Sequence, residues 1–143
     1  MPNSKRSVSK KRVTGIGGIF FKSRDPEALK EWYRIHLGIV CLPQGSAIFE
    51  WREIQPPGDT GQTVWAPFPV DTEYFNPSRS SFMINYRVAD LSRLLKQLKS
   101  EGVLVDDKFE EGDYGKFGWI MDPEGNRIEL WEPAPEAMAK PAG

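Results

Sequence analysis

The sequence predicts an α+β fold in which two βαβββ modules build a curved, half-barrel sheet around a cavity. Two patterns predict it. The order strand, capping aspartate, helix and glycine occurs twice, about 65 residues apart. Short β-like runs separated by turn residues then follow each helix. With 143 residues, the chain is long enough for one domain with a single core.

The first module, about residues 14–70, begins with a strand over residues 16–22. Asp25 is placed to cap a helix that begins at Pro26 and stops at Gly38. One apolar stripe at helical spacing runs along this helix, formed by Leu29, Trp32, Tyr33, His36 and Leu37. Further strands are expected over residues 47–51 and 63–68.

The second module, about residues 80–132, repeats this order with a strand over 82–88, a cap at Asp90 and a stop at Gly102. Its helical stripe consists of Leu91, Leu94, Leu95 and Leu98. Later strands are expected over residues 117–121 and 127–131, joined by a hairpin turn over 122–126. Each helix covers one face of its own strands, so the two bare faces shelter each other and enclose a cavity.

Composition limits the class of protein. Hydrophobic residues make up 39% of the chain and include 17 aromatic side chains, which excludes global disorder. No apolar run is long enough to cross a bilayer, so we expect no membrane partner. The single Cys41 excludes an intrachain disulfide and a cysteine-based zinc cluster, which favours a reducing, cytoplasmic location. The single His36 excludes a site built on several histidines.

Both ends of the chain are expected to be flexible tails around a domain at residues 14–132. Residues 1–13 carry five basic residues and no acidic one. We interpret them as a disordered, solvated basic tail, and residues 133–143 as a second flexible tail. The acidic balance of the remaining chain argues against a nucleic-acid partner, which would require a basic folded surface.

Three stretches carry a family resemblance: Arg24-Asp25-Pro26 opening the first helix, Leu37-Gly38 closing it, and Asp-Pro-Glu-Gly-Asn-Arg-Ile-Glu-Leu at 122–130. Together with the duplication, they resemble the vicinal oxygen chelate superfamily, the group of glyoxalase I, bleomycin-resistance proteins and extradiol dioxygenases. The resemblance covers roughly residues 15–132 and implies a glyoxalase-like fold.

Metal enzymes of that superfamily chelate a divalent ion at four positions, which the resemblance places here at Gly18, Ala66, Met83 and Glu129. Of these, only Glu129 offers a ligand that suits a hard cation. We therefore expect no metal and no cofactor. His36, in the helical stripe behind the sheet, and Cys41, interpreted as a small buried apolar side chain, do not supply replacements.

The cavity-facing residues follow from strand alternation, starting from Glu129. Gly18 is expected to widen the cavity, and two cations should keep Glu129 ionised. Residues 110–116 form either a loop that closes over the cavity mouth through Tyr114 or a plain solvated loop. The expected ligand-binding residues are Phe20, Lys22, Phe68, Asn85, Arg87, Tyr114, Phe117, Trp119, Glu129 and Trp131.

The irregular, aromatic-rich linker at residues 67–81 is expected to pack across a dimer partner or on the seam of its own chain. Exposed aromatic surface and the seam between the modules favour a homodimer. The modules could pair within one chain or across two.

Three functions remain open. The first is a metal-free protein, similar to the bleomycin-resistance branch, that binds a small planar or aromatic molecule. The second is a metal-dependent lyase, isomerase or dioxygenase with Glu129 as the catalytic residue. The third is a non-catalytic dimerising module whose cavity is filled. Substitution of three of the four ligand positions favours the first over the second.

Overall fold

The computed structural model describes residues 12–54 and 60–135. The predicted tails therefore lie largely outside the described residues, at 1–11 and 136–143. In chain order the elements are β1 (Val13–Ser23), α2 (Pro26–Leu37), β2 (Ala47–Arg52), β3 (Thr60–Pro69), β4 (Phe82–Val88), α3 (Leu91–Ser100), β5 (Leu104–Gly112), β6 (Gly115–Met121) and β7 (Arg127–Pro133).

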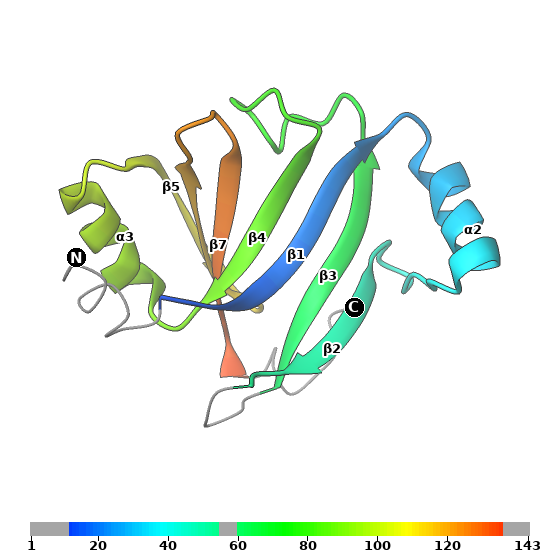
Figure 1. Ribbon diagram of the computed structural model, residues 1–143, viewed down its shortest axis with the longest axis horizontal. Helices are drawn as coiled ribbons and strands as arrows, with labels where there is room; N and C mark the ends of the chain where they lie inside the picture. The colour runs from blue at the N-terminus through cyan, green and yellow to red at the C-terminus, as the bar shows by residue number, and fades with distance from the viewer. Residues whose placement is uncertain (1–11, 55–59, 136–143) are drawn as a thin grey trace, which may run out of the picture.

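The seven strands form one mixed, curved sheet in the order β2-β3-β1-β4-β7-β6-β5, with α2 and α3 at opposite ends (Figure 1). The predicted α+β class is confirmed. The two modules join within the chain through the antiparallel pair β1 and β4. In this structure the two modules therefore pair inside one chain.

The helix caps form as the sequence predicts. Asp25 accepts a hydrogen bond from the Ala28 amide, and Gly38 ends α2 with φ 70°. Asp90 accepts one from the Arg93 amide at the start of α3, and Gly102 follows that helix with φ 86°. A positive φ costs glycine little, which explains why both helices stop where they do.

The two helices differ in how they use their apolar stripes. α3 packs on the outer face of the sheet, where Leu91 and Leu94 are buried against Val88 and Leu130. α2 has no buried residue, contrary to the expected stripe. Its Tyr33 packs edge-on against Trp65. The exposed large apolar residues of α2 are Trp32, Ile35 and Leu37.

The first module has one strand fewer than expected. It reads β1-α2-β2-β3 in the described residues, whereas the second reads β4-α3-β5-β6-β7. Comparison of the strand orders shows that the counterpart of β5 is missing from the described part of the first module. Residues 38–46 connect α2 directly to β2, whereas residues 101–114 contain all of β5. The shorter connection has too few residues to run along the sheet and return.

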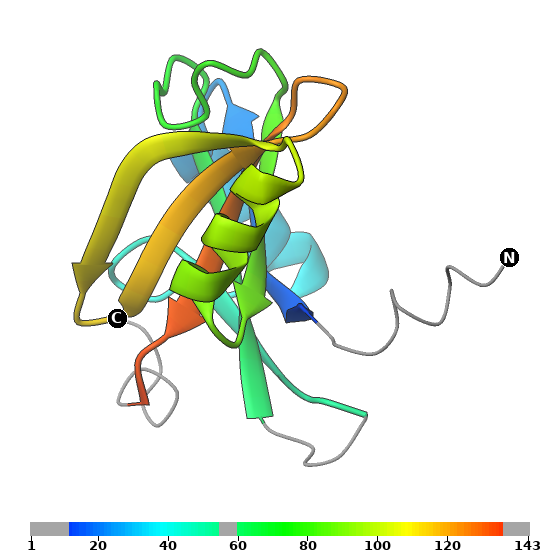
Figure 2. The same cartoon turned by 90° about the vertical axis from the view of Figure 1, so that its left-hand side faces the viewer.

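The βαβββ order requires a third strand after α3, but the sequence located none before residue 117. β5 supplies it and replaces much of the predicted loop at residues 110–116. β5 and β6 form a tight hairpin that turns at Asp113 and Tyr114 and curls over the side of the sheet that faces away from α3 (Figure 2). β5 is exposed along nearly its whole length and rich in charge, as is typical of a protected edge strand. It therefore lacks the apolar alternation by which strands are detected.

A second hydrophobic cluster lies on the inner face of the sheet, which we define as the face away from α3. It is formed by Phe20, Phe75, Met83 and Trp119. Phe75 belongs to the linker between β3 and β4 and is fully buried. The linker thus packs on the seam of its own chain, which is one of the two outcomes expected for it.

Candidate functional site

The register of the sheet relates the four positions at which the superfamily binds metal. Ile19 pairs with Ile84 at the centre of the β1–β4 ladder, so the pseudo-symmetry of the modules equates Gly18 with Met83. Phe20 pairs with Ala66 on β3, and its counterpart Asn85 pairs with Glu129 on β7. Ala66 and Glu129 are therefore equivalent positions, as the resemblance implied.

Glu129 is 2% exposed, and three donors hold its carboxylate. The Asn85 amide donates to Oε1 at 2.6 Å, and the Trp119 indole donates to Oε2 at 3.0 Å. The Tyr74 hydroxyl also donates to Oε2. These donors occupy three of about four acceptor positions that a carboxylate offers.

Burial raises the pKa of Glu129 above its usual value of 4.5, against the opposing effects of the hydrogen bonds from Tyr74, Asn85 and Trp119 and the charge of Arg127. Burial and the nearby Glu129 charge also raise the pKa of the Tyr74 hydroxyl, which keeps that group protonated as a donor. The expectation that two cations keep Glu129 ionised therefore needs correction.

Arg87, one of those cations, lies away from Glu129. It forms a buried ion pair with Glu53 at 2.6 Å, donates to Thr14 at 2.7 Å and stacks over the Trp51 ring. Strand β4 curves along its length. Arg87 lies two residues beyond Asn85 on this strand and is therefore directed away from Glu129. The other cation, Lys22, lies over the Phe75 ring at 5.7 Å. Neither lines the cavity beside Glu129.

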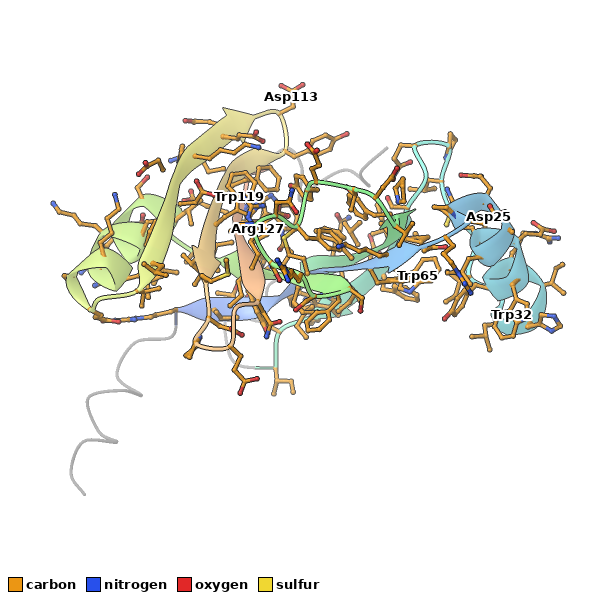
Figure 3. All side chains as sticks on the ribbon, turned by 90° about the horizontal axis from the view of Figure 1, so that it is seen from above. Asp25, Trp32, Trp65, Asp113, Trp119 and Arg127 are labelled. Atoms are coloured by element: carbon orange, nitrogen blue, oxygen red, sulfur yellow. The ribbon has the colours of Figure 1, made fainter. Side chains whose placement is uncertain are left out.

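Arg127 is the cation whose charge opposes the raised pKa of Glu129, although it was not among the residues expected to bind a ligand. Its guanidinium packs over the Trp119 ring at 4.9 Å and donates to the Tyr74 carbonyl at 2.8 Å and to Asp106 at 3.1 Å. Figure 3 shows Trp119 and Arg127 side by side below the linker between β3 and β4. Arg127 thus fixes the backbone of Tyr74 and with it the hydroxyl that reaches Glu129.

A cavity of about 290 Å³ opens above Glu129 on the inner face. Two stacked aromatic pairs line it, Phe117 with Trp131 and Phe68 with Tyr74. Gln44, Ser46 and Gln62 supply a polar wall from the first module. The complete lining is Gly17, Phe20, Gln44, Ser46, Gln62, Val64, Phe68, Tyr74, Asn85, Tyr114, Phe117, Glu129 and Trp131.

Seven of the ten residues expected to bind a ligand line this cavity: Phe20, Phe68, Asn85, Tyr114, Phe117, Glu129 and Trp131. Trp119 lies behind Glu129 in the core, and Lys22 and Arg87 lie elsewhere. Tyr114 is half exposed at the β5–β6 turn, where its carbonyl accepts a bond from the Trp131 indole. The sequence missed Tyr74, because no strand or helix periodicity marks a linker side chain.

Gly17, rather than Gly18, opens the cavity. The β1–β4 register shifts between Ile16 and Gly18, so the regular alternation of cavity-facing and outward-facing residues along β1 is interrupted there. Gly17 lines the cavity as a result. A Cβ atom on Gly18 would meet the Phe20 ring, which covers that position.

The two reactive side chains lie outside the cavity. His36 is exposed at the end of α2, where its ring lies tilted against Trp32 at 4.7 Å between centroids. Burial raises the pKa of the Cys41 thiol, which disfavours the thiolate at neutral pH.

The donor set around Glu129 does not fit the divalent metal that the fold implies. Gly18, Ala66 and Met83 offer no oxygen or nitrogen side-chain ligand. The N–H and O–H groups of Asn85, Trp119 and Tyr74 also point their positive ends at the carboxylate, where they would repel a cation. Within residues 12–54 and 60–135, no three His, Cys, Asp or Glu side chains gather as a metal site.

Comparison with known proteins agrees with this architecture. Residues 15–130 match the model of the Glyoxalase/Bleomycin resistance protein/Dioxygenase superfamily. The chain therefore belongs to that superfamily. No curated protein matches it.

Solved structures share the fold. The methylmalonyl-CoA epimerase of Mycobacterium tuberculosis has 24% identity and a TM-score of 0.57, covering 96% of this chain and 99% of its own. A variant of the Streptomyces coelicolor methylmalonyl-CoA epimerase in complex with 2-nitronate-propionyl-CoA has 21% identity and a TM-score of 0.59, over 85% and 99%. The 2,3-dioxygenase LapB from Pseudomonas sp. KL28 has 19% identity and 0.56, over 86% and 42%.

No helix among the described residues is long and apolar enough to cross a membrane.

Proposed function

We propose that this protein is a metal-free member of the superfamily that binds a small planar or aromatic molecule in the inner-face cavity. The observation that carries the proposal is the combination of an open cavity with aromatic walls and a carboxylate already held by protein donors. Apolar walls with a few convergent polar groups are typical of small-molecule sites.

The hydrogen bonds of Glu129 favour binding over catalysis. A general base needs a lone pair directed at the substrate, and a metal ligand needs one directed at the ion. Three donors already fill about three of the four acceptor positions of the Glu129 carboxylate. The other three superfamily metal positions, Gly18, Ala66 and Met83, have no suitable ligand atoms. The open cavity likewise disfavours a module whose interior is filled.

The epimerases of similar fold do not indicate the ligand. One of them is described in complex with methylmalonyl-CoA, whose acyl group carries a carboxylate. No lysine, arginine or histidine among the described residues lines the cavity to receive such a group. The proposal therefore keeps the shared fold and assigns a different ligand chemistry.

A thermal-shift screen of neutral planar aromatic compounds, combined with elemental analysis of the dialysed protein, tests this function. We expect several compounds to raise the melting temperature, because a ligand that binds only the folded state stabilises it. We expect far less than one equivalent of divalent metal after incubation with zinc, nickel, manganese or iron.

A matched pair of variants locates the binding site. Phe117→Ala removes a cavity wall and should abolish the shifts, whereas Phe109→Ala removes a half-exposed ring outside the lining and should preserve them. Stoichiometric metal that the Glu129→Gln variant fails to retain would overturn the metal-free function and favour the enzyme. Absence of any shift would overturn the binding function.

A further inference from the structure

The side chain of Asn85 has one polar atom that the protein leaves without a partner. Asn85 is 2% exposed, and its Nδ2 is used in the bond to Glu129. Its Oδ1 is buried and accepts no hydrogen bond from any described residue. Nearly all buried polar groups in folded proteins are paired, and leaving one unpaired costs stability. Such an exception beside a cavity points to an external donor.

Gly17 determines how closely this atom can approach β1. A Cβ atom at position 17 would lie 2.3 Å from Oδ1 of Asn85 and 2.9 Å from the Trp131 ring, so any other residue would displace the amide or the ring. Gly17 lies at the register shift of β1, and its φ is not in the left-handed region, so backbone conformation does not require glycine there. We call the place where Gly17, Asn85 and Trp131 meet the notch, and all three residues line the cavity.

The charges around the notch select against anions. Among the described residues, Glu129 is the only acidic one that lines the cavity, and no basic one does. An anionic ligand would meet the carboxylate in a region of low dielectric without a compensating cation. The Trp131 indole cannot replace the missing donor, because it donates to the Tyr114 carbonyl at 2.8 Å.

We infer that the cavity selects a neutral planar molecule that donates an N–H or O–H hydrogen bond to Oδ1 of Asn85 at the notch beside Gly17. This inference rests on the proposed function and specifies its ligand class. A molecule of the same shape without a donor leaves the acceptor unpaired.

Three probes of similar size test the inference by titration calorimetry: 2-naphthol, 2-methylnaphthalene and 2-naphthoate. The naphthol has the donor, the methyl compound has the same shape without it, and the naphthoate carries a negative charge. Wild type is compared with Gly17→Ala, whose Cβ would occupy the notch and displace the Asn85 amide or the Trp131 ring, and with Asn85→Leu, which removes the acceptor. Gly112→Ala is the control, because a Cβ there contacts nothing within 4 Å.

The decisive quantity is the ratio of the naphthol affinity to the methylnaphthalene affinity. The two probes differ in hydrophobicity, but this difference is the same for every variant and therefore cancels when the ratios of two variants are compared. We expect this ratio to fall about tenfold in Gly17→Ala and in Asn85→Leu, and to stay unchanged in Gly112→Ala. We also expect naphthoate to bind weakest to wild type.

Each other outcome has a defined meaning. An unchanged ratio in Gly17→Ala, with both neutral probes still bound, would overturn the role of the notch and leave the proposed function standing. Strongest binding of naphthoate would overturn the preference for neutral ligands. Failure of both neutral probes to bind wild type would overturn this inference through the proposed function itself. Gly17→Ala keeps all three donor residues of Glu129 in the chain, so it remains informative if Asn85→Leu does not fold.

Discussion

Tyr74 donates its hydroxyl hydrogen bond to Glu129 across 55 residues of sequence and thereby ties the linker between the modules to the last strand. The Tyr74 ring also stacks on Phe68 and lines the cavity. One side chain therefore helps to close the inner core, to shape the cavity and to hold the carboxylate at its floor. A variant that lacks only the hydroxyl separates these roles.

We expect Tyr74→Phe to lower the free energy of unfolding by about 1–3 kcal/mol, because a buried carboxylate loses a donor while the ring remains. Urea denaturation measures the loss. Tyr114→Phe, at a half-exposed position whose hydroxyl bonds to no described residue, should change stability far less. Equal effects of the two substitutions would show that the bond to Glu129 contributes nothing net.

Glu129 should also produce a definite pH dependence. Its pKa is raised in the folded state above the ordinary 4.5, so between these two pKa values the folded protein holds a proton that the unfolded chain has released. Stability from this group is therefore greatest below about pH 4.5 and is lost as the pH rises through the folded-state pKa.

The measurement is the difference in unfolding free energy between wild type and Glu129→Gln as a function of pH, in which the other titrating groups cancel. We expect wild type to lose stability relative to the variant as the pH increases from about 4.5. A difference that grows in favour of wild type over this interval would contradict the raised pKa.

Arg87 and Glu53 form a buried ion pair that supports the fold outside the cavity. We expect Arg87→Leu to cost about 3–5 kcal/mol, because it leaves the Glu53 carboxylate buried without a partner. The double substitution Arg87→Leu with Glu53→Leu should recover much of this loss. The exposed pair Arg34 and Glu31 serves as control, and its removal should cost under about 1 kcal/mol.

The protein is expected to form a homodimer, and the exposed apolar side chains of α2 are where we expect its interface. Ile35 is 59% exposed on a helix with no buried residue. Light scattering at micromolar concentration should give the mass of two chains, and Ile35→Glu should reduce it to one. Leu104→Glu, at a still more exposed position on β5, should leave the dimer intact. A single-chain mass for wild type would contradict the prediction.

Local chemistry explains what could be predicted. Asp25 and Gly38 delimit α2, and Asp90 and Gly102 delimit α3, because a cap and a left-handed residue act within one turn of chain. Alternation likewise placed Phe117 and Trp131 on the cavity side together with Glu129. Alternation did not locate the charged edge strand β5, because a strand that is exposed on both faces has no alternating pattern of apolar and polar residues.

The sequence by itself determined the repeated order of strand, cap, helix and glycine and much of the inner face of the central strands, since both follow from residue type and short-range spacing. The family resemblance added that three of the four superfamily metal positions have no ligand atoms. Only the tertiary structure decided that Tyr74 reaches Glu129, that Arg87 pairs with Glu53, and that Gly17 rather than Gly18 opens the cavity. These outcomes depend on the path of a linker, the curvature of the sheet and one register shift, all of which arise from long-range packing and leave no periodic signal in the chain.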